Sequence, residues 1–586
     1  MKKISYIIFM VLLGSVSSVL TSCSDFLDQE SDRVIYSDKE RLDNASDTLY
    51  SVIGIMNKMQ ALADRTVLLG ELRGDLVDVC DNTSADLREI SNFSVSSDNQ
   101  YNSPRDYYAV INNCNYFLAK ADTALKNNRN EYVFQKEYAA VKAYRAWTYL
   151  QLVLNYGKVP LVTDPILTKD DADKQYEMYD IKGICNYFVN DIAAYQDVEM
   201  PGYGTIRNND SRLFYIPIKV LMGDLNLWAG NYKEAAKCYY NFINTRNGSN
   251  SAFPIGNYTS AWSKSDTKWQ MSTDSWSYHC FEQETYTSTS EILTVIPGDS
   301  IPSEGNYSEL KNLFNSNSDN SYKASIIASQ NLTNLSKSQK YCHINTANEV
   351  TYAPDNLSSA RAGDLRLGSC YTEVANSGLM LNGQSIGTYI SNTKYTTRNV
   401  RIYRLTMVYL RLAEALNRAG YPRFAFAILQ KGVNNNVLES DVLPYYPEDE
   451  AYLSQFDFST NLYKTRTRAN GSDENTIGIH SHGCGWTEYN EYYTYPESGS
   501  VDAEMEAVEN MIVDEEALEF AFEGLRYYDL MRVALRRNDP AYLANKVYAR
   551  RGADKTAEMK NLIGVDLTNT SNWYLNWNGK LGLSAE

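Results

Sequence analysis

Histidine, the side chain that most often serves as a general base, is scarce in this sequence. Only four histidines occur among 586 residues. No glycine-rich phosphate loop follows a predicted strand, and the many acidic residues form no recognisable pair of the kind that a glycoside hydrolase uses. These absences favour a protein that binds its ligand without changing it. An extracellular glycosidase is the alternative from another class.

The sequence also lacks proline-, serine- or glycine-rich linkers that would divide so long a chain. Length alone suggests several domains, but no compositional boundary separates them. We therefore predict one domain over residues 38–586, with loop-rich insertions at about 246–345 and 440–500.

Positive charge is in deficit. The net charge is -17, and it becomes -19 without residues 1–22, which carry two lysines and no acid. Such a field repels a phosphate backbone, so we expect no nucleic-acid partner. Neutral glycans, cationic peptides and metal ions are all compatible with this charge.

Cysteine is sparse and scattered, which argues against a disulfide scaffold. One cysteine, Cys23, has a distinctive position, because it ends an apolar run that follows two lysines. Leu20-Thr21-Ser22-Cys23 has the pattern of a lipoprotein processing site, whereas a plain secretory signal has no use for the cysteine. We predict a signal peptide at 1–22, a lipid on Cys23 and a polar tether over 23–37, so that the protein is anchored to a membrane without spanning it. A buried N-terminal helix is the alternative.

Helical periodicity dominates the rest of the chain. Residues 134–162 contain one helical pattern, which Gly157 and Pro160 end. Residues 216–243 and 404–433 each contain two, separated by a glycine-containing break. In the last two stretches, small residues lie near the point where the two helices would cross, as in tetratricopeptide helix-turn-helix units. The predicted fold is mainly α: a tetratricopeptide-like scaffold of helical hairpins, whose long irregular loops form a ligand-binding lobe. Generic helical hairpins are the alternative.

Aromatic residues are weighted toward rings with a polar group. The chain has 47 tyrosines and 8 tryptophans but only 17 phenylalanines. Rings in polar loops suit stacking on sugars or peptides, although most of them will line helix contacts. Our candidate ligand contacts are the loop aromatics and a polar group near the N-terminus, namely Trp262, Trp269, Trp276, Tyr278 and Trp486, with Arg73, Asp78, Asp81 and Asn82.

Two segments could bind a metal ion. His480-x-His482-x-Cys484 places three ligand types close together, but the spacing fits no standard zinc site and no fourth ligand is evident. We therefore predict no metal site and no cofactor there. The segment NSNSDNS at 315–321 offers oxygens for a structural calcium ion, which the sequence leaves open.

Several stretches resemble the SusD/RagB family of bacterial outer-membrane lipoproteins. The most specific is EEALEFAFEGLRYYDLMR at 515–532, and LLGELRGDLVDV, YYAVINNCNYFL, AYRAWTYLQLVLNYGKVPLV, GDLRLG and VYLRLAEALNRAG occur in the order that the family shows. The chain departs from the family in its C-terminal tail, which is not proline-rich. The resemblance implies a cell-surface lipoprotein that binds an oligosaccharide and delivers it to a SusC-type TonB-dependent transporter. A RagB-like peptide importer, or a scaffold for partner proteins alone, are the alternatives.

The signature itself predicts one helix. Leu518, Phe522, Leu525 and Asp529 follow a helical stripe, and the pairs Glu523–Arg526 and Asp529–Arg532 have i,i+3 spacing. Adjacent Glu515 and Glu516 point about 100° apart on a helix, so they cannot act on one substrate bond. We expect structural ion pairing here and no catalysis.

Overall fold

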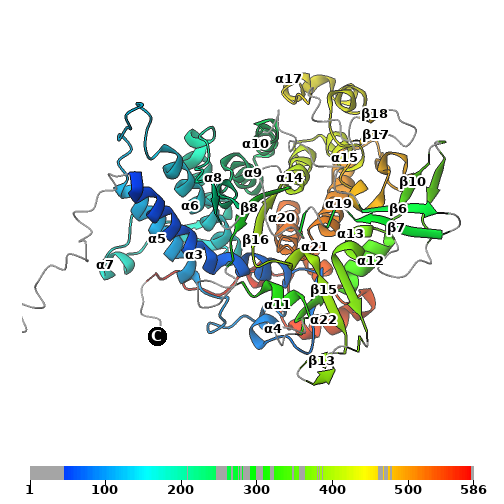
Figure 1. The fold of residues 1–586 in the computed structure, drawn as a ribbon, viewed down its shortest axis with the longest axis horizontal. Helices are drawn as coiled ribbons and strands as arrows, with labels where there is room; N and C mark the ends of the chain where they lie inside the picture. The colour runs from blue at the N-terminus through cyan, green and yellow to red at the C-terminus, as the bar shows by residue number, and fades with distance from the viewer. Residues whose placement is uncertain are drawn as a thin grey trace, which may run out of the picture.

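The protein is mainly helical, as predicted (Figure 1). The computed structural model describes residues 45–581 except 207–208, 246–259, 266–267, 275, 278–279, 282–290, 299–307, 317–322, 346, 348, 355–362, 376, 379, 382, 386, 459–465, 468–472 and 475–477. Cys23, the predicted signal peptide and the tether lie outside these residues, as does most of the segment considered for calcium.

The longer helices are α3 (Ala45–Glu71), α5 (Pro104–Lys120), α6 (Gln135–Tyr156), α8 (Ile181–Ile192), α9 (Ile218–Ala229), α10 (Tyr232–Thr245), α14 (Leu405–Arg418), α15 (Pro422–Gln430), α19 (Val501–Phe520), α20 (Arg526–Arg537) and α21 (Pro540–Tyr548). The shorter ones are α4 (Ala85–Ser91), α7 (Lys169–Ala172), α11 (Leu310–Phe314), α12 (Gln330–Ser338), α13 (Leu365–Cys370), α16 (Asn435–Val437), α17 (Glu450–Leu453), α18 (Ser481–Cys484) and α22 (Thr556–Ile563). Among the described residues, no helix is both long and apolar enough to span a bilayer.

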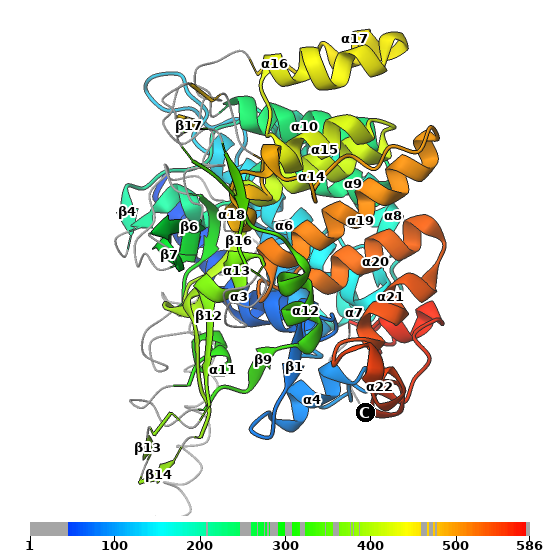
Figure 2. The same ribbon diagram turned by 90° about the vertical axis from the view of Figure 1, so that its right-hand side faces the viewer.

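The helices stack as successive antiparallel hairpins. Packing runs from α5 through α6, α8, α9 and α10 to α14, α15 and α19, and α20 closes the series against α3. Figure 2 shows α10, α15, α14, α19, α20 and α21 in this order from top to bottom. Thus the two hairpins predicted from sequence, about 190 residues apart, are neighbours through α10 and α14. The tetratricopeptide-like scaffold is confirmed.

Glycine permits the close crossing of α9 and α10. A Cβ added to Gly223 would lie 2.6 Å from Cδ1 of the buried Tyr239, and Gly230 ends α9 with φ 86°. The α6 helix ends in the same way at Gly157, with φ 73°. The sequence signals for these helix ends are therefore confirmed.

Replacing Gly223 by alanine is expected to lower the free energy of unfolding by about 1–3 kcal/mol, because the added methyl group overpacks the crossing. Gly54→Ala in α3 is the control. Nothing lies within 4 Å of its added Cβ, so alanine there should stabilise the helix by about 0.5–1 kcal/mol. Urea unfolding of both variants measures the difference; equal effects at the two positions would contradict a close crossing at Gly223.

Strands occur as antiparallel pairs, each in a two-stranded sheet. The pairs are β1 (Val77–Val79) with β9 (Ile326–Ala328), β2 (Lys158–Pro160) with β3 (Met178–Asp180), β4 (Thr205–Ile206) with β5 (Asn209–Asp210), β6 (Ser260–Ser265) with β7 (Lys268–Asp274), β8 (Ile292–Ile296) with β16 (Val400–Arg404), β10 (Cys342–Ile344) with β11 (Val350–Tyr352), β12 (Tyr371–Val374) with β15 (Tyr389–Asn392), β13 (Met380–Leu381) with β14 (Gln384–Ser385) and β17 (Arg466–Thr467) with β18 (Asp473–Glu474).

The C-terminal signature is not one helix, so that prediction is wrong. α19 ends at Phe520 and α20 begins at Arg526. Between them Phe522 and Gly524 have φ 72° and 83°, and Glu71 at the end of α3 accepts their backbone N–H groups at 2.9 and 2.8 Å. This contact with α3 stabilises a turn where the local pattern favours helix. The expected Glu523–Arg526 pair is consequently absent, and both residues have other partners.

Candidate functional site

A network of buried charges lies beneath the signature. Glu515 and Glu519 of α19 both pair with Arg366, whose Nη1 lies 2.6 Å from Glu515 Oε1 and 2.8 Å from Glu519 Oε2. Arg404 pairs with Glu519 (Nη1–Oε1 2.7 Å) and Glu523 (Nε–Oε2 2.9 Å). Each of these side chains is at most 7% exposed. The glutamates of the signature therefore form structural ion pairs, as expected.

A second cluster lies along α20 and α14. Arg532 binds Glu414 (Nη2–Oε2 2.6 Å and Nε–Oε1 2.8 Å) and also pairs with Asp529 at 2.9 Å. The predicted Asp529–Arg532 pair is thus confirmed. Arg526, the expected partner of Glu523, instead binds Asp75 (Nε–Oδ1 2.6 Å) after α3.

Three of the other stretches that carry the family resemblance supply buried charged residues that bind in or beside these two clusters. LLGELRGDLVDV supplies Glu71 and Asp75, GDLRLG supplies Asp364 and Arg366, and VYLRLAEALNRAG supplies Glu414. Ion pairs and hydrogen bonds join them to the signature across more than 100 residues of sequence. Their common role is to hold the scaffold together.

The ion pairs control the acidity of the buried glutamates. Burial alone would raise the pKa of Glu515, but Arg366 and His480 outweigh it and hold the pKa at about 2. Burial likewise opposes ionisation of Glu414, where Arg532 and Arg536 lower the pKa to about 2. Both carboxyls are more acidic in the folded than in the unfolded chain.

Acid is therefore expected to destabilise the protein. The unfolded state binds more protons below its glutamate pKa of 4.5, so each depressed carboxyl contributes stability that is complete above pH 4.5 and is lost as the pH falls toward 2. The loss is on the order of 3 kcal/mol per carboxyl. Urea unfolding at pH 7, 4.5 and 3 measures it, and a free energy that stays constant between pH 4.5 and 3 would contradict these ion pairs.

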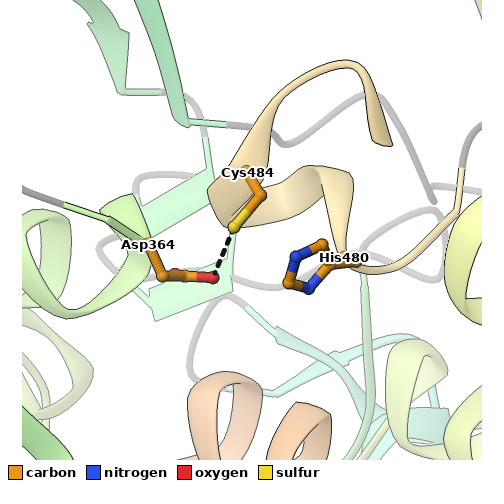
Figure 3. Close-up of side chains that lie close together, drawn as sticks. All are labelled: Asp364, His480 and Cys484. Atoms are coloured by element: carbon orange, nitrogen blue, oxygen red, sulfur yellow. Dashed lines mark hydrogen bonds between the residues drawn. The ribbon is translucent and has the colours of Figure 1, made fainter. Parts of the chain in front are cut away.

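The His480-x-His482-x-Cys484 segment is buried against this network. The Nδ1 atoms of His480 and His482 lie 2.7 Å from Glu515 Oε2 and 3.0 Å from Glu519 Oε2. The Cys484 thiol donates to Asp364 at 3.4 Å, and the His480 ring lies beside both groups (Figure 3). The eight cysteines that the structure describes form no disulfide with one another.

Two of the predicted ligand contacts lie in the interior. Trp276 is 0% exposed and donates its indole N–H to Glu519 Oε1 at 3.2 Å. Arg73 is 1% exposed, donates to the Trp573 carbonyl at 3.0 Å and lies 4.1 Å above the Tyr527 ring. Neither side chain reaches the surface, so the prediction that they contact ligand is wrong. Both residues stabilise the scaffold.

The remaining polar candidates surround β1. Asp78 binds Arg551 (Oδ2–Nε 2.6 Å), and Asn82 donates to the Lys323 carbonyl at 2.7 Å. Asp81 and Asn82 are exposed. In both views α4, which follows this group, lies apart from β6 and β7 (Figures 1 and 2). The structure therefore does not bring the polar candidates together with the aromatic loops.

The segments that carry the remaining aromatic candidates lie close together in the fold. Trp262 and Trp269 lie on β6 and β7, and β6 contacts α13 and α18. Trp486 follows α18 and donates its backbone N–H to Cys342 of β10 at 2.9 Å. Tyr278 lies outside the described residues. Two loop regions about 200 residues apart in sequence thus meet around α18.

Three tyrosines form a group beside β10 and β11, which we call the tyrosine platform: Tyr352, Tyr489 and Tyr492. Trp486, a predicted ligand contact, is only 7% exposed and belongs to a buried cluster against which Tyr352 and Tyr489 pack. The structure therefore makes Trp486 a support of the platform and not an exposed contact. The Tyr492 ring is 63% exposed and meets Tyr352 edge-on, with centroids 5.2 Å apart. The Glu491 N–H donates to the Tyr352 hydroxyl at 3.0 Å, and Trp486 packs edge-on against Tyr489. Hydrogen bonds and ring contacts fix these aromatic rings in place before any ligand arrives.

A polar cavity of about 220 Å³ lies between α3 and the start of β16. Arg65 and Tyr101 line it, together with Asp64, Glu309 and Arg398. Arg65 is 8% exposed, and among the described residues its Nη1 has no hydrogen-bond partner. The cavity is smaller than the about 300–1,000 Å³ typical of drug-sized ligands, so it fits one sugar ring or one side chain. The sequence did not indicate this site, because its lining comes from five separate segments.

Comparison with known proteins decides the family. The family model of the SusD family matches residues 239–577, more than half of the chain. The chain belongs to the SusD family. A SusD superfamily protein of Bacteroides vulgatus has a similar structure at 14% identity (TM-score 0.54, covering 91% of this chain and 96% of that one), as does one of Bacteroides thetaiotaomicron at 15% identity (TM-score 0.53, covering 84% and 89%). No curated protein matches the chain.

The stretches that resemble the SusD family identify residues of the scaffold and not residues of the ligand surface. The family's sequence stretches contribute buried charges and helix contacts, which maintain the scaffold. The tyrosine platform lies in the loops between those stretches. Its only signal in the sequence was the aromatic-rich run that includes Trp486 and Tyr492.

Proposed function

We propose that this SusD-family protein captures oligosaccharides at the cell surface and delivers them to a SusC-type TonB-dependent outer-membrane transporter. The observation that carries the proposal is the tyrosine platform. It presents an exposed ring on a helical scaffold, supported by neighbouring rings. Aromatic faces of this kind bury the apolar face of a sugar ring while the hydroxyls stay solvated.

The relatives support a glycan as the ligand. A protein of Bacteroides vulgatus described as SusD-like and carbohydrate-binding has a similar structure at 14% identity (TM-score 0.50, covering 84% of both chains). We assign the first sugar contacts to Tyr492 and Tyr352, which the buried Trp486 supports, and further contacts to Trp262, Trp269 and Tyr278 in the neighbouring loops. Asp81 and Asn82, on the separate surface near β1, are proposed as a second contact region.

The proposed location follows from the N-terminal sequence. A lipid on Cys23 would anchor the chain to the outer membrane, and the tether over 23–37 would let the folded domain reach a transporter beside it. The helical hairpins offer a broad face for that partner.

Capture requires no covalent chemistry. The carboxylates Glu515 and Glu519 of the signature form buried ion pairs with arginine. A Gly-x-Ser-x-Gly pattern occurs at 383–387, but Ser385 lies in the short β13–β14 hairpin and not between a strand and a helix. It therefore lacks the setting of a nucleophile elbow.

Native electrophoresis through gels that contain neutral polysaccharides, acidic polysaccharides or none tests the proposal. Retarded migration with one glycan class, and co-isolation of a TonB-dependent transporter from membranes, is the expected result. Unchanged migration with every glycan, combined with binding of peptides, would overturn glycan capture and favour a peptide importer. Release of sugar products would instead favour a glycosidase.

A further inference from the structure

Three potential metal ligands meet below the ligand-binding loops. Asp364 precedes α13, and His480 and Cys484 belong to the 478–485 segment, more than 100 residues later. One ligand atom from each of the three lies within 4.8 Å of the others, and the residues are at most 1% exposed (Figure 3). The structure thus supplies the additional ligand that the spacing of the segment alone does not show.

The backbone brings the two ligands of the 478–485 segment onto one side. The Cys484 N–H donates to the His480 carbonyl at 3.0 Å, so these residues are one helical turn apart and face the same way. A side chain at Gly483 would collide with the Asp364 carboxylate. Glycine at this position therefore allows the segment to approach Asp364 closely.

A second carboxylate orients the histidine. Glu515 Oε2 lies 2.7 Å from His480 Nδ1, which leaves Nε2 as the ring nitrogen for a metal. Metal-bound histidines generally use their other nitrogen in this way, because the hydrogen bond fixes the tautomer and the ring orientation. In the same turn, His482 Nε2 is buried and has no hydrogen-bond partner among the described residues.

Carboxylates outnumber arginine and lysine side chains among the groups around these three residues. Four carboxylates, Asp364, Glu515, Glu519 and Glu523, face three permanent cations, Arg366, Arg404 and Lys394. His480 and His482 lie against Glu515 and Glu519 in the same network. Buried carboxylates are stable when they pair with cations or bind metal ions. A divalent ion at Asp364 would add a cation to this group.

We propose that Asp364, His480 and Cys484 bind one zinc ion that fastens the 478–485 segment to α13. Carboxylate oxygen, imidazole nitrogen and thiolate sulfur are all zinc ligands, and a water molecule supplies the fourth position. Binding replaces the thiol proton of Cys484, which is released to solvent. Arg366 Nη2 lies 2.7 Å from Asp364 Oδ2, so the carboxylate bridges the guanidinium group and the metal.

Metal analysis and cobalt substitution test this site without any glycan. The purified protein is stripped with a chelator, reloaded with zinc or cobalt(II) and dialysed. About one equivalent of zinc should remain, and the cobalt form should show a thiolate-to-cobalt absorption band in the near ultraviolet. Cys484→Ser should lose the band and the bound metal. Cys370→Ser, which removes another buried thiol at the end of α13, should retain both.

The wild-type protein alone can overturn the proposal. Folded wild-type protein, checked by circular dichroism, that retains no zinc and shows no thiolate band after reloading would exclude the site. An unchanged band in Cys484→Ser would exclude Cys484 as a ligand and would also overturn the proposal.

Discussion

Replacing Arg404 by methionine is expected to lower the free energy of unfolding by about 3–5 kcal/mol. Arg404 binds Glu291, Glu519 and Glu523 and also donates to the Glu519 carbonyl at 2.9 Å. Methionine fills much of the same volume but removes a buried cation that three carboxyl groups share. The loss of charge pairing therefore dominates the effect, and urea unfolding at pH 7 measures it.

An exposed ion pair provides the control. Lys136 and Glu199 pair at 2.7 Å, but their side chains are 49% and 81% exposed. Lys136→Met should leave stability nearly unchanged, because solvent screens exposed pairs. If Arg404→Met were as harmless as Lys136→Met, the buried network would not be what holds the signature in place.

The second large effect is expected in ligand binding. Tyr492→Ala should weaken binding of the captured glycan by about 2 kcal/mol or more, roughly 30-fold in Kd, as for an aromatic residue at the centre of an interface. Because Tyr492 is 63% exposed, the fold should tolerate the change. Tyr132→Ala removes a similarly exposed ring, 50% exposed, from a different loop and should bind as the wild type does. Equal affinities of wild type and Tyr492→Ala would place the glycan elsewhere, and the cavity beside Arg65 would then be the next site to test.

The helical scaffold could be predicted because its signals are local. Apolar periodicity and glycine stops predicted α6, and the α9–α10 and α14–α15 hairpins, with their breaks in the right places. The turn at 521–525 could not be predicted, because it depends on Glu71, some 450 residues earlier in the chain. Local sequence favours a helix there, and the distant hydrogen bonds decide the outcome.

The candidate site was harder to predict for the same reason. Trp276 occurs in a polar, loop-like sequence, but its indole N–H donates to Glu519 in the interior. Arg73 likewise finds its partners at the far end of the chain, near Trp573. Trp486 is also buried, whereas Tyr492 of the same loop region is 63% exposed and packs against Tyr352 of β11. Sequence indicated which loops are aromatic, but only the fold shows which rings reach the surface.

Isothermal titration of the purified protein with neutral polysaccharides, acidic polysaccharides and mixed peptides tests the central claim most directly, with chromatography of each mixture to detect products. If the protein captures glycans, one glycan class should give a binding heat with no turnover, and Tyr492→Ala should lose that heat. Heat with peptides alone, or release of sugar products, would contradict it.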